Sequence, residues 1–521
     1  MNVIHLSDYK GGDDRARFAA ALNDAKKIPG TTVVVEPGTY LITTPRARAA
    51  QNSVMTGEYG DNPQPVMFSP DYVYDRGLDF YGHDGTTLEA YGALFIVDGF
   101  MEDISLRNCR GVTIRGLTID NRRRPYTKGF VREMDGDTAE VELTEYMPSA
   151  APIMRTGVYS RKYGRFVPDK RTVGNIVSND GREARVRIKG DVTDAVGDEI
   201  YFCHTWHFRP SVLIENAKDI LIENVAIRCH AGMGVTGFHS ENVTLKNFSV
   251  IPAPGESHST NTDATHFSSC RGKLVFDGCR FEGHGDDALN VHTYYYTVAE
   301  HEKNRVVLEV MAPTGTHTQA LDYPRAGDRM DLCGAESLDV IKTYRVTSVE
   351  VDEKRGDCTV ELDGALPDDM SSYLLADPDE TPEVEIRNCS LKNHFARGFL
   401  IKSRKCLIEN CDFEDIFELG VKVAAESSWH EGVNVDSIVI RNCRFRNCGR
   451  EKSICGGIHI YMEAPERRAT HGYAEITDNL IDCPECDHGI IIKDVKRALL
   501  RNNRVISRKD PVVIGDNVKT L

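Results

Sequence analysis

The chain has 521 residues, of which 40% are hydrophobic and 27% are charged, which is typical of a globular protein and excludes low-complexity and fibrous classes. Its 79 acidic and 63 basic residues give a formal net charge of −16, so nucleic acid is not expected as a partner. This charge neither requires nor excludes a sugar substrate.

Residues 1–8 contain neither the basic nor the apolar stretch of a signal peptide, and no run of about 18 apolar residues occurs that could cross a membrane. We therefore expect no membrane partner and a cytoplasmic location, or a secreted one if a leader has been removed. Residues 13–22 predict an amphipathic helix, and residues 33–40 predict a first strand with its turn. This pattern is typical of the cap that covers the open end of a solenoid.

A short apolar unit recurs along the chain. Each copy alternates apolar residues with polar ones around an Asn or Gly, as in two short strands joined at a corner in the left-handed conformation. The corner at Asn224 returns at Asn247, and the corner at Asn388 returns at Asn410 after a nearly equal interval. One unit cannot bury its own apolar face, so stacking is favoured, and we predict an all-β right-handed parallel β-helix. The copies lie at residues 112–119, 220–227, 243–250, 274–281, 384–389, 407–413, 439–445 and 499–503.

Two tracts interrupt this repeat, residues 125–208 and residues 293–382. Both contain strand-like alternation, and each has a Gly-Asp turn signal, at Gly197 and at Gly327. They predict two small antiparallel β-barrels looped out of the helix, the second of which would wall the site. The expected domains are the cap with the first coils (1–124), the first insertion (125–208), the central coils (209–292), the second insertion (293–382) and the C-terminal coils (383–521).

The fifteen cysteines are odd in number, and their spacing does not suit a disulfide framework. Several follow a corner Asn or Gly, which predicts a stacked column of small buried thiols. Cys483 and Cys486 form a Cys-x-x-Cys pair without a second pair at zinc-ribbon spacing, so the metal signal is weak and no metal is expected. The column contains Cys109, Cys279, Cys389, Cys411 and Cys443.

The strongest functional signal is a pair of acidic clusters, at Asp263 and at Asp286-Asp287. The interval from Asp263 to Asp286 equals the local repeat length, so the clusters are expected to lie above one another on one face. Carboxylates held side by side raise one another's pKa, and a chain that keeps them together usually uses them. The commonest use of two or three facing carboxylates is hydrolysis of a glycosidic bond.

Hydrolysis with inversion needs an acid that protonates the leaving oxygen and an opposed carboxylate that activates water, roughly 6.5–9.5 Å away. Side chains that lean apart from coils about 4.8 Å apart can span this range. We predict Asp286 as the general acid and Asp263 and Asp287 as the residues that position and deprotonate the water, although Asp286 and Asp287 could exchange roles. Gly285 offers a bend that could turn both neighbouring aspartates outward.

The motif Asn-Thr-Asp followed by Asp-Asp on a β-helix is similar to that of the polygalacturonase family of inverting glycosidases. A longer set of motifs resembles the bacterial α-1,3-galactosidase family that cleaves the blood-group B determinant. This resemblance implies removal of terminal α-linked galactose with inversion, no cofactor, and Asp263, Asp286 and Asp287 as catalytic acids. The motifs lie at residues 230–235, 263–267, 270–272, 286–292, 397–401 and 429–432, within the region 205–450.

A galactose pocket also needs an aromatic platform and groups that bind hydroxyls. Trp206 and Trp429, the two tryptophans, are the first aromatic candidates, and residues 294–296 offer three tyrosines that could equally form a buried strand. Glu431 could instead be a further acid, and the histidines could be structural. The predicted substrate-binding residues are His266, His292, Trp206, Trp429, Arg397, Lys402, Glu426 and Glu431.

Other functions remain open. A galacturonidase or polygalacturonase-like glycosidase is one, since Lys402 and Lys422 would suit the carboxylate of a galacturonate. A polysaccharide lyase or epimerase would want a calcium site and a basic residue, and the basic partner is not evident. A non-catalytic carbohydrate-binding solenoid would have no reason to gather three acids around one coil. The favoured partner is a galactose-terminated glycan, and the chain could form a homo-oligomer.

Overall fold

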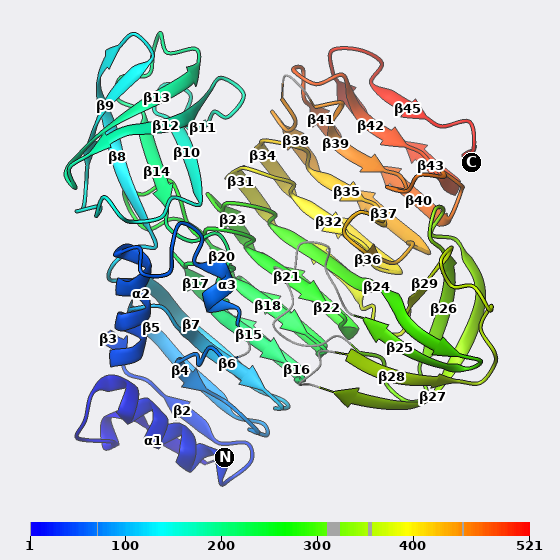
Figure 1. Cartoon of the computed structure of the whole chain (residues 1–521), viewed down its shortest axis with the longest axis horizontal. Coiled ribbons are helices and arrows are strands. Elements are labelled where there is room, and N and C mark those ends of the chain that lie inside the picture. The colour runs from blue at the N-terminus through cyan, green and yellow to red at the C-terminus, as the bar shows by residue number, and fades with distance from the viewer. Residues whose placement is uncertain (1, 70, 310–322, 353–356, 451–452) are drawn as a thin grey trace.

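The computed structural model of the chain describes residues 2–69, 71–309, 323–352, 357–450 and 453–521. Its main body is a stack of coils in which three parallel ladders of strands follow one axis, with the two termini at opposite ends (Figure 1). The predicted parallel β-helix is confirmed.

The three ladders repeat in register along the axis. The first contains β1 (Val3–His5), β2 (Thr32–Val34), β5 (Thr87–Asp98), β7 (Thr113–Asn121), β16 (Lys218–Glu223), β19 (Glu241–Lys246), β22 (Arg271–Asp277), β30 (Glu383–Arg387), β33 (Lys405–Glu409), β37 (Ser437–Arg441), β40 (His471–Thr477), β43 (Val495–Arg501) and β46 (Lys519–Thr520). The second contains β3 (Gly38–Thr43), the far halves of β5 and β7, β17 (Ala226–Ile227), β20 (Ser249–Val250), β23 (Arg280–Glu282), β31 (Ser390–His394), β34 (Asp412–Ile416), β38 (Arg444–Arg446), β41 (Leu480–Asp482) and β44 (Arg504–Ile506). The third contains β4 (Arg76–Asp79), β6 (Glu102–Arg107), β15 (Val212–Glu215), β18 (Val235–Phe238), β21 (Thr265–Ser268), β24 (Leu289–Glu302), β32 (Phe399–Ile401), β35 (Val421–Val423), β39 (Cys455–Ile460), β42 (His488–Ile492) and β45 (Val512–Ile514).

The corners between the first and second ladders explain the repeated asparagines. Asn224 and Asn247 have φ values of 55° and 48°, in the left-handed region that Asn tolerates better than most residues. The Nδ2 of Asn247 donates to Oδ1 of Asn224 at 3.3 Å, and the same bond joins Asn410 to Asn388 at 3.5 Å. The asparagines therefore form short hydrogen-bonded steps between coils.

The cysteines that follow these corners point into the coils. All fifteen cysteines of the chain are buried and none forms a disulfide. The Sγ of Cys389 lies 3.7 Å from the carbonyl oxygen of Phe276, and that of Cys411 lies 3.9 Å from the carbonyl oxygen of Ile386. These thiols pack in the main hydrophobic core, which runs continuously inside the coils.

A helical cap covers the amino end. Helix α1 (Asp14–Lys26) begins at Asp13, whose side chain accepts a hydrogen bond from the N–H of Ala16 at 2.8 Å. Its buried residues, among them Phe18 and Leu22, join the core of the first coils. The other helical segments near this end are η1 (Leu6–Asp8), α2 (Pro45–Met55) and α3 (Gln64–Met67).

The first insertion is a seven-stranded antiparallel sheet with its own apolar core, in the order β11-β10-β14-β8-β9-β13-β12. It leaves the coils after β7 and returns just before β15, a strand of the third ladder. Its strands are β8 (Tyr126–Asp135), β9 (Thr138–Leu143), β10 (Arg155–Ser160), β11 (Arg165–Phe166), β12 (Arg171–Asn179), β13 (Glu183–Gly190) and β14 (Glu199–Cys203).

The second insertion closes into a small barrel, in the order β24-β25-β28-β27-β26-β29 and back to β24. Its first strand is the far end of β24, which begins as a strand of the third ladder. It returns to the coils at β30, and a short strand, β36 (Glu431–Gly432), also pairs with β24. The remaining strands are β25 (Arg305–Glu309), β26 (Arg329–Gly334), β27 (Val340–Asp352), β28 (Asp357–Leu362) and β29 (Tyr373–Ala376).

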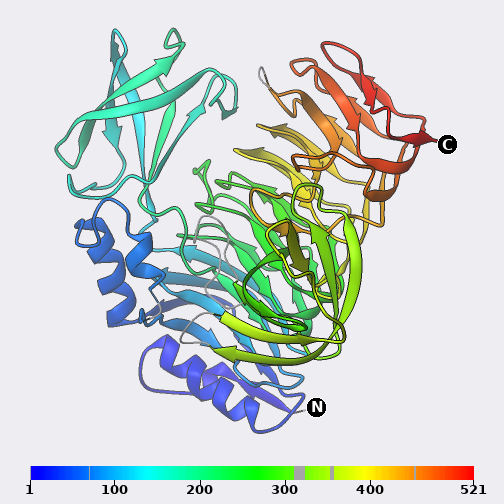
Figure 2. The ribbon, with the colours of Figure 1, turned by 45° about the vertical axis from the view of Figure 1, so that its right-hand side comes forward.

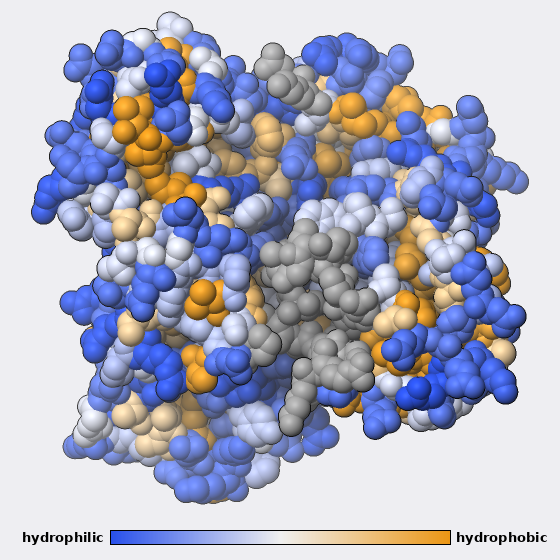
Figure 3. All heavy atoms as spheres, viewed as in Figure 1, coloured by the Kyte–Doolittle hydropathy of each residue, from blue (hydrophilic) through white to orange (hydrophobic). Residues whose placement is uncertain are grey.

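These connections place the two insertions at opposite edges of the third ladder, the first where its strands start and the second where they end (Figures 1 and 2). The outer face of this ladder therefore lies between them. The face seen in Figure 3 is mainly hydrophilic, and its apolar side chains lie in small separate patches. Within the described residues, every helix is too short or too polar to be a membrane span.

Candidate active site

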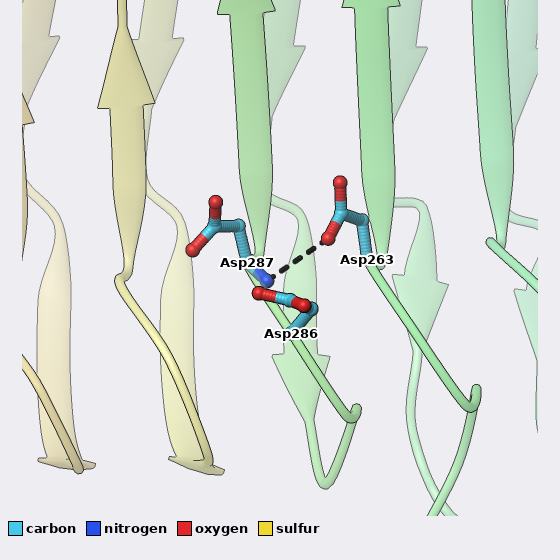
Figure 4. A group of neighbouring side chains, drawn as sticks. All are labelled: Asp263, Asp286 and Asp287. Carbon is cyan, nitrogen blue, oxygen red and sulfur yellow. Dashed lines mark hydrogen bonds between the residues drawn. The ribbon is translucent and has the colours of Figure 1, made fainter. Parts of the chain in front are cut away.

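The three predicted acids meet on the loops that lead into two neighbouring strands of the third ladder. Asp263 precedes β21, and Asp286 and Asp287 precede β24, which pairs with β21 in parallel. One carboxylate oxygen from each lies within 4.8 Å of the others. Figure 4 shows the side chains converging from the two coils, with the N–H of Asp287 donating to Oδ1 of Asp263 at 3.1 Å.

Gly285 allows this approach. A Cβ at this position would lie 2.1 Å from the carbonyl oxygen of Asn261 in the preceding coil, so any side chain would push the two loops apart. The segment around Gly285 is an irregular loop rather than a strand, so the strict alternation that would separate Asp286 from Asp287 does not apply. The closest oxygens are nearer than the expected range of roughly 6.5–9.5 Å, because the loops hold the side chains together instead of letting them lean apart.

The three carboxylates have different surroundings. The side chain of Asp286 is 28% exposed and lies 3.9 Å from Nη1 of Arg155. Asp287 is almost fully buried and accepts hydrogen bonds from the backbone N–H of Arg397 at 3.0 Å and from its Nη2 at 2.7 Å. Asp263 is also buried, and its Oδ2 lies 2.7 Å from Nδ1 of His266.

These surroundings move the pKa values of the buried pair. Burial, followed by the charge of Asp286, raises the pKa of Asp263 well above its ordinary value. Burial also raises the pKa of Asp287, while the guanidinium group of Arg397 opposes this by favouring the ionised carboxylate. The arginine contact is what distinguishes the two buried acids.

A chain of hydrogen bonds runs from Asp263 into the protein. Nδ1 of His292 lies 3.0 Å from the carbonyl oxygen of Thr293, and because a carbonyl oxygen can only accept, this Nδ1 carries the proton. In a neutral ring the Nε2 of His292 must then accept a hydrogen bond, which Nε2 of His266 donates at 2.8 Å. Burial lowers the pKa of His266 to about 4 and that of His292 to about 3, so both rings are neutral near pH 7. Nδ1 of His266 then accepts, and Asp263 is the protonated donor.

Four of the predicted sugar-binding residues lie behind the acids. His292 and Lys402 have no exposed surface, and Glu426 and Glu431 are 3% and 5% exposed. Lys402 binds both glutamates and Asn290, and Nε2 of His292 lies 3.8 Å from Glu431. In this structure the contacts of these four residues support the site and leave almost no open surface, and their predicted role in binding the sugar stays a prediction.

The glutamates of this group are held as carboxylates. Although burial acts in the opposite direction, the ammonium groups of Lys402 and Lys422 lower the pKa of Glu426 to about 2. Burial again acts in the opposite direction, but the ammonium group of Lys402 helps to hold the pKa of Glu431 well below its ordinary value. An ionised Glu431 that is bound by a lysine is not placed to serve as a further proton donor.

Of the other predicted residues, Arg397 binds Asp287 directly, and His266 binds Asp263. Trp206 and Trp429 are 40% and 39% exposed, on the loops before β15 and β36. The three tyrosines at residues 294–296 are buried in β24, which agrees with the alternative prediction that they form a buried strand.

Arg155 is the residue that sequence reasoning missed. It begins β10 of the first insertion, and its guanidinium group lies over the ring of Phe395 at 5.0 Å. Its Nη1 is buried next to Asp286 and has no hydrogen-bond partner among the described residues. No repeat or motif surrounds Arg155 in the sequence, so only the docking of the first insertion reveals it.

The three aspartates also form a group of oxygens that could hold a metal ion, as do Asp328, Asp377 and Glu380. At the aspartates, Arg397 already uses both oxygens of Asp287. A calcium ion prefers six to eight oxygen ligands, so this set fits it poorly.

The chain was compared with known proteins. A family model described as "Right handed beta helix region" matches residues 373–505. Alpha-1,3-galactosidase A of Bacteroides fragilis is 24% identical over 96% of this chain and 86% of its own length. Alpha-1,3-galactosidase A of Bacteroides thetaiotaomicron is 27% identical over 84% of this chain and 80% of its own length. The predicted resemblance to α-1,3-galactosidases is confirmed.

The likeness to these α-1,3-galactosidases spans more of the chain than the motifs at residues 230–432. Among solved structures, the family 28 exopolygalacturonase of Yersinia enterocolitica aligns with 98% of this chain and 78% of its own chain, at 12% identity and a TM-score of 0.39. The mannuronan C-5 epimerase A-module of Azotobacter vinelandii aligns with 99% of both chains, at 10% identity and a TM-score of 0.40.

Proposed function

We propose that the protein is a glycoside hydrolase that removes terminal α-1,3-linked galactose from glycans with inversion of configuration. The observation that carries this proposal is the set of three aspartates with three different environments, in a chain that resembles α-1,3-galactosidases along its length. Different environments allow carboxyl groups of the same kind to take different roles.

In this proposal Asp286 is the general acid. It is the most exposed of the three and therefore the one that a glycosidic oxygen can reach. The guanidinium group of Arg155, whose Nη1 lies 3.9 Å from Oδ2 of Asp286, holds this carboxyl group in place. Protonation of the leaving oxygen by a positioned carboxylic acid contributes about 10²–10⁴ in rate.

Asp287 is the base that activates water, and Asp263 positions that water. Arg397 favours the ionised form of Asp287, as a base requires, whereas Asp263 holds a proton against His266. A water that bridges two oxygens with hydrogen bonds of about 2.8 Å at the tetrahedral angle spans about 4.6 Å. The separation of up to 4.8 Å between the acidic oxygens suits such a water.

The charges around the site favour a neutral sugar over a galacturonate. Lys402 and Lys422 were the cations that could have bound a sugar carboxylate. Lys402 is paired with Glu426 and Glu431, and Lys422 with Glu426 and Glu463. A galacturonate would have to displace one of these partners, at a cost that a neutral galactose avoids.

The test compares two substrates with different leaving groups, p-nitrophenyl α-galactoside and Gal-α-1,3-Gal. Asp286→Asn is expected to lower kcat/KM for Gal-α-1,3-Gal by about 10²–10⁴, and to act less on p-nitrophenol, which leaves without full protonation. Asp287→Asn is expected to abolish turnover of both substrates. NMR of the wild-type reaction is expected to show β-galactose as the first product.

Three results would contradict parts of the proposal. If α-galactose is the first product, the enzyme retains the anomeric configuration and the proposed inversion is wrong. Cleavage of an α-galacturonide, with neither galactoside turned over, would move the assignment to a galacturonidase. If no glycoside is cleaved, a non-catalytic carbohydrate-binding protein becomes the better description.

A further inference from the structure

A cavity of about 310 Å³ lies on the outer face of the third ladder, beyond the acids toward the carboxyl end. The residues that matter for its chemistry are Glu418, Leu419, Lys422, Ile454, His459 and Tyr461. None of them was singled out from the sequence except Lys422. The volume is at the lower end of the range for ligand pockets, roughly 300–1,000 Å³, and suits a small ligand.

The cavity continues the row of loops that carries the acids. These loops precede β24, β32, β35 and β39, and they carry Asp287, Arg397, Glu418 and Ile454 on successive coils. Arg397 joins the two regions, since its Nη2 lies 2.7 Å from Asp287 and its Nη1 lies 3.6 Å from Glu418. With coils about 4.8 Å apart, the cavity lies about 10–14 Å from the acids.

Its lining combines apolar and polar groups, as sugar-binding sites do. Ile454 is 57% exposed, and Leu419 and Tyr461 add apolar surface. The ring of His459 stacks against Tyr461 at 4.1 Å between centroids, and Lys422 lies 5.5 Å over the same tyrosine ring. The polar groups are thus held in place by packing rather than left to move in solvent.

The charges at the cavity favour an uncharged ligand. Nζ of Lys422 lies 2.7 Å from Glu463 and also binds Glu426, while Arg397 is shared between Asp287 and Glu418. Burial lowers the pKa of His459 to about 3, so its ring is neutral at physiological pH. An anionic sugar would meet the carboxylate of Glu418, and Lys422, the cation that lines the cavity, is already paired.

We propose that this cavity binds a neutral sugar residue of the glycan on the leaving-group side of the cleaved bond. The inference rests on the proposed function, because an enzyme that removes a terminal galactose has the rest of the glycan on that side alone. The distance from the acids places the occupant beyond the residue to which the galactose is joined.

The test fills the cavity by Ile454→Trp and compares Gal-α-1,3-Gal with a neutral tetrasaccharide that ends in the same disaccharide. Ile454 is exposed, so the larger side chain can be added without disturbing the core. Ile454→Trp is expected to lower kcat/KM for the tetrasaccharide by about tenfold, mainly through KM, and to leave the disaccharide within about twofold. The control is Ile506→Trp, the same change at an exposed position of β44 in the second ladder.

Binding separates this inference from the proposed function. Titration calorimetry of Asp286→Asn is expected to give tighter binding of the tetrasaccharide than of the disaccharide, and Ile454→Trp is expected to remove the difference. If the wild type cleaves no galactoside but the variant still binds the tetrasaccharide more tightly than the disaccharide, the proposed function is wrong and the sugar-binding cavity is supported. Equal affinity for both saccharides, or an equal effect of Ile454→Trp on both substrates, overturns the site.

Discussion

Asp263 illustrates how a single buried carboxyl group in the proposed active site can reduce stability. Its proton lies toward His266, whose other nitrogen donates to His292, and the carbonyl of Thr293 ends the chain. Because burial raises its pKa, the folded state binds this proton more tightly than the unfolded state does. The free energy of unfolding therefore falls as the pH rises above the unfolded value of about 3.9, and this loss continues up to the folded pKa.

Replacing Asp263 by Asn is expected to remove this loss. The amide of Asn can donate to His266 as the protonated acid does, but it cannot ionise. Asp263→Asn should therefore lower kcat by about a hundredfold or more, while its Tm equals that of the wild type near pH 4 and is higher at pH 8. Differential scanning calorimetry at both pH values measures this difference.

Asp287→Asn is the matched comparison. It leaves the largely buried guanidinium group of Arg397 without its carboxylate, so its Tm is expected to fall at both pH values. A Tm of Asp263→Asn that drops below the wild type as the pH rises would show that Asp263 is ionised in the folded protein.

At the scale of elements, the first insertion supplies a side chain to the site. Arg155 begins β10 and reaches Asp286, although the insertion folds around a separate core. The insertion is therefore part of the site, in addition to the second insertion that the sequence predicted as its wall.

Arg155→Ala is expected to lower kcat/KM about tenfold, because it removes the cation beside Asp286, and to lower Tm slightly, because the contact with the ring of Phe395 is lost. Arg161→Ala serves as the control, since Arg161 lies in the same insertion, is 59% exposed and pairs with Glu199. Steady-state kinetics and a melting curve of each variant give the comparison. An equal loss of activity in both variants would mean that the insertion acts through its overall stability.

A cluster of ion pairs joins the second insertion to the coils, in addition to an apolar cluster that both parts share. Arg271 of β22 donates to Asp328 at 2.9 Å and to Glu380 at 2.6 Å, and Glu380 has no exposed surface. Arg271→Met would leave these buried carboxylates without their main partner, and is expected to cost about 3–5 kcal/mol in unfolding free energy. Urea unfolding measures this loss.

Lys273→Met offers a control on the same strand. Lys273 pairs with Glu385 in solvent, and such exposed pairs contribute about 0–1 kcal/mol. Similar losses for Arg271→Met and Lys273→Met would mean that the barrel is held by its apolar contacts and not by this cluster.

At the scale of the whole molecule, the coils bury one continuous core from the cap to the last strands, and all fifteen thiols lie in buried positions. Burial raises the pKa of a core thiol such as Cys406, and the thiolate is the reactive form. No cysteine is therefore expected to react with an aromatic disulfide reagent in the native protein, whereas all fifteen should react in denaturant.

The expected Tm is the same with and without a reducing agent, because no disulfide contributes to stability. Spectrophotometric counting of released thiolate, before and after denaturation, tests both statements. Rapid reaction of even one thiol in the native protein would reveal local opening of the coils.

Most of the fold could be predicted from the sequence because its information is local and periodic. The spacing of Asn224 and Asn247 specified a coil, and alternation specified which side chains face inward. Asp263 and Asp286 could be paired for the same reason, since their separation equals one coil. The contacts of the residues behind the acids could not be predicted in this way. A polar residue on the outer face of a coil gives the same sequence pattern whether it faces solvent or forms a buried ion pair.

The sequence by itself determined the parallel β-helix, its two interruptions and the meeting of three aspartates, because stacking turns a regular period into contacts. Only the tertiary structure decided what surrounds those acids. Arg155 lies within the first insertion, far from Asp286 in the sequence, and the whole second insertion separates Asp287 from Arg397. The position in which an insertion docks follows from no sequence repeat. How separate parts of the chain pack in space therefore decides these contacts, the pairing of Lys402 and Lys422, and the cavity beyond Arg397.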